Sequence, residues 1–155
     1  MKLLYLDYNC FQRGFDDPTQ TRIQMEALAC NEIFMRALQS KVTLVCSFMH
    51  EDENSLSPFP RYRSEVLNLA ALCEVSIAPS DSIRNQAMKF ESSNQIDAKD
   101  AIHLACALSA KVQVFLTCDD RLIRRARKIK LPFAVMNPVA YVTGESHNET
   151  EAASQ

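Results

Sequence analysis

Four acidic sites in separate parts of this 155-residue chain could do chemistry together, and three of them stand at the boundary of an expected strand or helix. Asp7 follows the apolar run 2–6, Asp119 follows the apolar run 112–116, and Asp100 lies in the first turn of an expected helix. Carboxylate oxygens are the donors that Mg²⁺ and Mn²⁺ prefer in proteins. Carboxylates held close together repel one another unless a cation lies between them. The pattern therefore predicts a divalent-metal site.

The fourth acidic stretch offers three candidates in succession, Glu51, Asp52 and Glu53. If a short helix begins near Phe48, neighbouring side chains point about 100° apart around its axis. Only one of the three can then face a shared ion. The periodicity of the sequence does not choose between them.

Each acid also has a purely structural explanation. Asp7 can simply end a strand, Asp100 can be the acidic member of a cap three residues after Asp97, and Asp119 can cap a helix. Topology favours the shared site, because the carboxyl ends of parallel strands form the edge of a sheet at which ligands bind. Asp7 and Asp119 both follow expected strands, and the helix that Asp100 opens leads into the second of them.

Strands and helices are expected to alternate along the chain. The short apolar runs lack polar alternation, as strands buried on both faces do, and the longer segments repeat apolar residues with a period near 3.6. The expected strands are 2–6, 42–46, 75–78, 112–116 and 132–136, and the expected helices are 18–40 with Asp17 as cap, 62–72, 80–92, 98–110 and 120–130. This order predicts an α/β fold with three α/β/α layers around a central, mainly parallel sheet of about five strands.

Composition indicates one globular domain, with 47% hydrophobic and 23% charged residues. We place that domain at residues 1–142 and expect the polar, aperiodic stretch 143–155 to be a disordered tail. No apolar run is long enough to cross a membrane and no signal peptide is evident, so we predict a cytoplasmic protein.

The six cysteines form no CxxC pair and are expected to be reduced, buried hydrophobes rather than disulfides or a zinc site.

Three segments resemble the metal-binding motifs of PIN domains, the nuclease fold that includes VapC-type toxins. They are Leu6-Asp7-Tyr8-Asn9, Lys99-Asp100-Ala101-Ile102-His103-Leu104-Ala105 and Leu116-Thr117-Cys118-Asp119. The likeness runs from Lys2 to about Val142 and includes the late Asn137-Pro138. The resemblance rests on the order and spacing of these segments as much as on their residue types.

The resemblance implies a role for each matching residue. Asp7, Asp100 and Asp119 would be metal ligands. The family's glutamate usually follows a serine at the end of the second strand by about six positions, which from Ser47 points to Glu53 and leaves Glu51 in reserve. The supporting residues would be Asn9, Thr117 and Asp120, and we expect His103 to pack or hydrogen-bond rather than ligate. Relatives often carry glycine near two positions that are Gln95 and Lys111 in this chain.

The activity implied by the resemblance is hydrolysis of phosphodiester bonds in single-stranded or loop RNA with Mg²⁺ or Mn²⁺. Such an endoribonuclease would be the toxin of a toxin–antitoxin pair, with an antitoxin protein as a candidate partner and a homodimer as a candidate assembly. The net charge of −2 gives no overall attraction to RNA, so binding would need a local basic patch. The candidate RNA contacts are Arg13, Arg121 and Arg124, and the candidate stacking residues are Phe11, Phe15, Phe59 and Tyr62.

Two other functions remain open on the sequence. The fold can serve as a binding or regulatory module with little catalysis, although a complete set of four acids argues against this. The chain can also be a phosphoryl-transfer enzyme in which an aspartate after the first strand, Asp7, is phosphorylated. Asn9 stands where that chemistry usually places a second aspartate.

Overall fold

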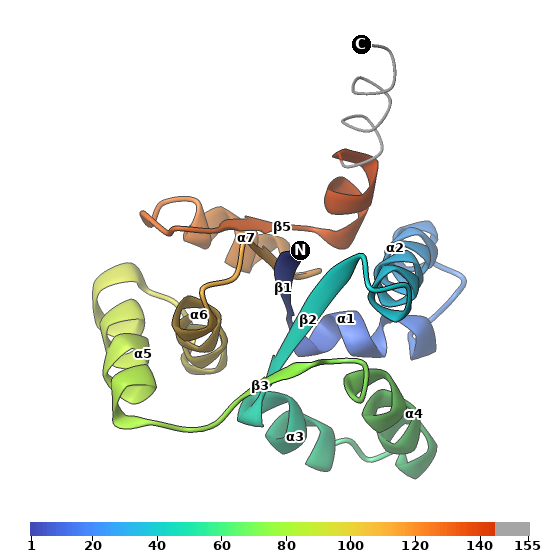
Figure 1. Ribbon diagram of the computed structural model, residues 1–155, viewed down its shortest axis with the longest axis horizontal. Coiled ribbons are helices and arrows are strands. Elements are labelled where there is room, and N and C mark those ends of the chain that lie inside the picture. The colour runs from blue at the N-terminus through green and yellow to red at the C-terminus, as the bar shows by residue number, and fades with distance from the viewer. Residues whose placement is uncertain (145–155) are drawn as a thin grey trace.

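The computed structural model describes residues 1–144, whose centre is a five-stranded sheet in which every neighbouring pair is parallel. The strand order is β3-β2-β1-β4-β5, so β1 lies in the middle (Figure 1). Within the register, Tyr5 of β1 pairs with Val45 of β2 and Phe115 of β4. The strands are β1 (Lys2–Leu6), β2 (Val42–Ser47), β3 (Val75–Ile77), β4 (Val114–Leu116) and β5 (Ala134–Met136). The predicted parallel sheet is confirmed.

Helices cover both faces of this sheet. Successive side chains of β1 point to opposite faces: Tyr5 packs in the cluster made with α5, α6 and α7, whereas Leu4 and Leu6 pack with α1, α2 and α4. Figure 1 shows α5 and α6 on one side of the sheet and α1 and α2 on the other. The helices are α1 (Tyr8–Gln12), η1 (Arg13–Phe15, a 3-10 turn), α2 (Thr21–Leu38), α3 (Phe48–Ser55), α4 (Pro60–Ala70), α5 (Asp81–Asn94), α6 (Ala98–Ala110) and α7 (Asp120–Ala126). The three-layer α/β/α prediction is therefore correct.

The segment after β1 differs from the prediction. Residues for which no helix was predicted form α1 and η1, and α2 begins at Thr21 rather than at Pro18. Asp17 does not cap α2, because its carboxylate accepts hydrogen bonds from the backbone and hydroxyl of Thr19 in a local turn. Such short polar side chains stabilise turns as readily as helix starts.

Two helices end in residues with left-handed backbone. Gln95 closes α5 and Lys111 closes α6, each with φ of 56°. Both residues stand near positions for which the resemblance implied glycine. Left-handed backbone is costly for a residue with a Cβ atom, so both turns keep the shape that glycine would favour at some cost in stability.

Residues 138–144 are helical, so the last described helix runs through Thr143 and Gly144. The domain boundary at residue 142 stays a prediction. The rest of the predicted disordered tail, 145–155, lies outside the described residues. Among residues 1–144, no helix has the length and apolar character needed to cross a membrane.

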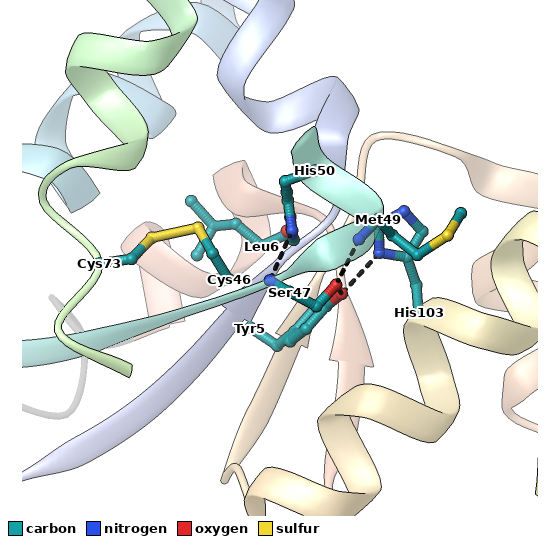
Figure 2. The surroundings of a disulfide bond; sticks show 8 residues. All are labelled: Tyr5, Leu6, Cys46, Ser47, Met49, His50, Cys73 and His103. Carbon is teal, nitrogen blue, oxygen red and sulfur yellow. Dashed lines mark hydrogen bonds between the residues drawn. A yellow bond between two sulfur atoms is a disulfide. The ribbon is translucent and has the colours of Figure 1, made fainter. Parts of the chain in front are cut away.

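The cysteines divide into two groups. Cys46 of β2 and Cys73, just before β3, are joined by a disulfide (Figure 2). The prediction that all six cysteines are reduced is therefore wrong for this pair, whose approach depends on strand pairing between β2 and β3 and not on any sequence spacing. The other four are free and buried, as expected: Cys10, Cys30, Cys106 and Cys118.

Candidate metal centre

Asp7 lies at the carboxyl edge of the sheet, where β1 ends. Its backbone N–H donates to the carbonyl of Leu116 at 2.8 Å, which ties it to the neighbouring strand β4. Its carboxylate caps α1 by accepting from the N–H of Tyr8 at 2.7 Å, and it is only 6% exposed. The prediction that Asp7 could merely end a strand is incomplete, because the side chain is held inward at the junction of β1, β4 and α1.

Thr117 and Asn9 connect the first and last acids of the candidate site. The Thr117 hydroxyl donates to Asp7 Oδ2 at 2.8 Å and accepts from the backbone N–H of Asp119 at 3.1 Å. The Asn9 amide lies 3.3 Å from Asp7 Oδ2 and 3.2 Å from the Thr117 hydroxyl. Thr117 and Asn9 therefore help to orient Asp7, and Thr117 also contacts the backbone of Asp119. The resemblance implied such a supporting role for both residues.

Glu53 is the member of the acidic triplet that α3 turns toward Asp7. Its Oε1 lies 2.5 Å from Nε2 of His103, and the same nitrogen is 3.9 Å from Asp7 Oδ1. Glu51 and Asp52 are exposed. Of the three acids, Glu53 is therefore the one that faces His103 and Asp7, and its role as a metal ligand stays a prediction. His103 hydrogen-bonds, as expected.

A buried polar network behind these acids was missed by sequence reasoning. The Tyr5 hydroxyl lies 2.6 Å from His103 Nδ1 and 2.8 Å from the Ser47 hydroxyl (Figure 2). His50 accepts from the Ser47 N–H at 2.9 Å and donates to the carbonyl of Leu6 at 2.6 Å. The only sequence signal was polar Tyr5 inside an apolar strand. The chain from Tyr5 through His103 to Glu53 fixes the orientation of the Glu53 carboxylate.

Asp100 shows the strongest electrostatic sign of crowded acids. Burial, followed by the negative charges of Asp7 and Asp119, raises its pKa from 3.8 to about 7. Asp100 stands in the first turn of α6, so its helix brings it to the same edge as the ends of β1 and β4. The three acids predicted from topology therefore influence one another in the folded chain.

Two further pKa shifts arise from the same crowding. Burial raises the pKa of Asp7, although the charge of His103 and the Thr117 hydrogen bond oppose this. Burial lowers the pKa of His103, but its hydrogen bond with Glu53 and the charge of Asp7 outweigh burial and leave that pKa raised. A positive charge at His103 and a cation at the acids would thus stabilise the same carboxylates.

The donor set fits a hard divalent cation, because it consists of carboxylate oxygens supported by an amide and a hydroxyl. In residues 1–144, however, no three of these carboxylates offer oxygens that all lie within 4.8 Å of one another. Glu53 is engaged by His103, and the Asp119 carboxylate caps α7 by accepting from the N–H groups of Arg121 and Leu122. The N-cap explanation of Asp119 is thus correct as well.

Two predicted residues make other contacts. The Asp120 carboxylate pairs with Arg22 at 2.7 Å and points away from the acids toward α2. Arg13, a predicted RNA contact, is engaged by Asp16 at 2.7 Å and by buried Glu26 at 3.0 Å. Both residues therefore have structural ion pairs that the sequence did not indicate. The remaining predicted RNA contacts, Arg121 and Arg124, are exposed on α7.

A groove of about 630 Å³ opens beside Glu53 and Lys99. Its wall carries aromatic rings: Tyr62 stacks on Phe15 with ring centroids 5.4 Å apart and lies 5.2 Å from Phe59. Phe59 is 56% exposed, whereas Phe11 is 1% exposed and belongs to the core. Three of the four candidate stacking residues therefore line one groove together with Glu53.

Comparison with known families adds the decisive observation, because the family model described as PIN domain matches residues 4–128. The chain belongs to the PIN domain family. The match includes the predicted metal ligands and the helices and strands that position them.

Solved structures also share the fold of this PIN domain. FitAcB from Neisseria gonorrhoeae is 18% identical, with a TM-score of 0.54 over 87% of this chain and 97% of the other. VapBC2 from Rickettsia felis, bound to a DNA fragment from its promoter, is 14% identical, with a TM-score of 0.58 over 87% of this chain and 98% of the other. Comparison with curated protein sequences gave no significant match.

Proposed function

We propose that this PIN domain is an endoribonuclease that hydrolyses phosphodiester bonds with Mg²⁺ or Mn²⁺. One observation carries the proposal: Asp7, Asp100 and Asp119, which are far apart in the sequence, lie near one another at the carboxyl edge of the sheet, where burial and the charges of Asp7 and Asp119 raise the pKa of Asp100. Glu53 adds a negative charge beside Asp7. Carboxylates arranged in this way are suited to hold a divalent ion. Asp7, Glu53, Asp100 and Asp119 would be its ligands, with Glu51 too exposed to join them.

A bound divalent ion would supply an activated water and stabilise the leaving oxygen of the phosphodiester. The protein's part is to hold the ligands. Thr117 and Asn9 fix Asp7, and His103 holds Glu53 until a cation competes for its carboxylate. Because the ion attracts Asp100 in its charged form, metal binding should displace the proton that the raised pKa favours.

The aromatic groove supports single-stranded RNA as the substrate. Unpaired bases can stack on exposed rings such as Phe59 and Tyr62, and such stacking is largely independent of base identity. Lys99 at the mouth of the groove and Arg121 and Arg124 on α7 would contact phosphates. Arg13 is not proposed to contact RNA, because its guanidinium already pairs with Asp16 and Glu26.

We propose further that the chain is the toxin of a toxin–antitoxin pair located in the cytoplasm. The likeness to VapC-type toxins and to the fold of VapBC2 supports a protein partner of antitoxin type. A homodimer is proposed on the same likeness. An antitoxin seated on the groove beside Glu53 would block RNA, so co-expression of the partner should suppress cleavage.

The proposal is tested by cleavage of a single-stranded RNA oligonucleotide with Mg²⁺ or Mn²⁺ and with EDTA. Glu53→Gln keeps the size of the side chain but removes the charge. We expect cleavage to slow by about a hundredfold or more, because loss of a residue that only supports a metal ligand already costs about 10- to 100-fold. Glu51→Gln on the same helix is the matched control and should cleave normally. Cleavage that survives EDTA, or equal loss in both variants, would overturn the assignment.

Two further measurements, RNA binding and phosphodonor labelling, test the two alternative functions. Metal-dependent RNA binding without cleavage in the native chain would indicate a binding module. Covalent labelling of Asp7 by a phosphodonor would indicate phosphoryl transfer, and the nuclease proposal expects no such label.

A further inference from the structure

Three free cysteines lie together behind the acidic edge and have no part in the proposed reaction. Cys10 comes from α1, Cys30 from α2, and Cys118 from the turn between β4 and α7. Their sulfur atoms all lie within 4.8 Å of one another, and the residues are 1%, 1% and 4% exposed. In residues 1–144 this is the single group of three or more histidine, cysteine or acidic residues with ligand atoms that close together.

The spacing of the sulfurs suits a metal ion. A Zn²⁺–sulfur bond is about 2.3 Å long, which places thiolates around one ion roughly 4 Å apart. Soft thiolate ligands select Zn²⁺ and Cu⁺ over hard cations such as Mg²⁺. The cluster therefore differs in chemistry from the carboxylates and favours a softer cation than they do.

The surroundings of the cluster carry charges of both signs. The guanidinium of Arg13 acts electrostatically on Cys118 and favours its thiolate, whereas the buried carboxylate of Glu26 acts on Cys30 and opposes its thiolate. The Cys10 sulfur contacts the other two thiols and lies 3.5 Å from the side chain of Asn9 and from the carbonyl of Leu116. Thiols are weak donors, so coordination would cost little hydrogen bonding.

We propose that Cys10, Cys30 and Cys118 bind one thiophilic d¹⁰ cation, Zn²⁺ or Cu⁺, at a site separate from the carboxylates. Binding would release the thiol protons to solvent and join α1, α2 and the turn before α7 through the ion. Asp7 directly precedes α1 and Asp119 directly follows Cys118. The ion would therefore restrict the movement of the backbone that carries these two acids.

The test uses the full chain under anaerobic conditions, with a reductant that does not bind metals and with excess Mg²⁺ to occupy hard sites. Co²⁺ replaces Zn²⁺ as the spectroscopic probe, and Cu⁺ is titrated against a chromophoric chelator. We expect about one equivalent of each ion, with thiolate-to-cobalt charge-transfer absorption. That absorption should be lost in Cys10→Ser, Cys30→Ser and Cys118→Ser.

Matched controls separate this site from other thiols and from the carboxylates. Cys106→Ser removes a buried free cysteine outside the cluster, and Cys46→Ser removes a thiol that reduction of the disulfide exposes. Both variants and Asp7→Asn should keep the absorption. No charge-transfer band in the native chain, or a band that persists in all three cluster variants, would overturn the proposal.

A variant that fails to fold does not remove the test, because the native chain gives a second measurement. The cation should protect Cys10, Cys30 and Cys118 from alkylation at least about tenfold while leaving the alkylation rate of Cys106 unchanged, as read by mass spectrometry of peptides. Equal protection of all four cysteines would mean general tightening of the fold and would count against the site.

Discussion

At the scale of single residues, the pKa of Asp100 is raised by burial and by its acidic neighbours. Its pKa of about 7 lies above the ordinary value of 3.8, so the folded chain binds more protons than the unfolded chain between these two pH values. The contribution of Asp100 to the stability of the metal-free protein therefore falls as the pH rises from about 4 to 7. This is the expected signature of a site built for a cation rather than for stability.

Replacement of Asp100 by asparagine should make the metal-free protein more stable while abolishing cleavage. At pH 8 with EDTA we expect Asp100→Asn to gain on the order of 2 kcal/mol in unfolding free energy, after allowance for solvent screening of a partly exposed group. Near pH 4 the gain should vanish, because Asp100 is then protonated. Urea denaturation at the two pH values measures the difference.

The control for this prediction is Asp81→Asn, which removes an exposed acid from the first turn of α5. It should change stability little at either pH. A variant Asp100→Asn that is no more stable than the native chain at pH 8 would contradict the electrostatic coupling of Asp100 to Asp7 and Asp119.

Sequence reasoning at this scale found the residues that follow strands but not those that reach the site through rotation of a helix. Asp7, Asp100 and Asp119 were predicted because sheet topology alone brings them to one edge. Glu53 could be separated from Glu51 only by the likeness to a family, since the rotation of α3 is set by packing. The thiol cluster was invisible, because its cysteines have no spacing in common.

At the scale of elements, the sequence predicted every strand, and the five expected helices are α2, α4, α5, α6 and α7. The short apolar runs of β1, β2 and β4 predicted burial on both faces, which the two core clusters confirm. What failed was local: α1 and η1 are too short for periodicity to detect, and Asp17 and Thr19 form a turn in place of a helix start. The energy of such short segments comes from tertiary contacts, which a single sequence does not display.

The left-handed ends of α5 and α6 yield a test at this scale. Lys111 has φ of 56°, a conformation that costs a side-chain-bearing residue roughly 1–2 kcal/mol, partly offset by the greater freedom of glycine in the unfolded chain. We therefore expect Lys111→Gly to stabilise the protein by about 0.5–1 kcal/mol in urea denaturation. Lys89→Gly, in the interior of α5, should instead destabilise it by about 1 kcal/mol. A loss of stability in Lys111→Gly would contradict the strain.

At the scale of the whole molecule, binding of RNA must depend on where charge lies, because the net charge is −2. The candidate contacts Arg121 and Arg124 are exposed on α7, directly after Asp119, so phosphates could lie along α7 beside the acidic edge. Attraction confined to a few side chains should give a modest dependence of affinity on salt.

This expectation can be measured with single-stranded RNA in an Asp100→Asn background, where cleavage is absent. Each of Arg121→Ala and Arg124→Ala should lower the slope of log affinity against log salt by roughly 0.7, the value for one phosphate contact on a single strand. Lys41→Ala is the control, since Lys41 is exposed just before β2, at the opposite edge of the sheet. If Lys41→Ala reduced the slope as much as the α7 variants, binding would follow overall charge and the proposed path along α7 would be wrong.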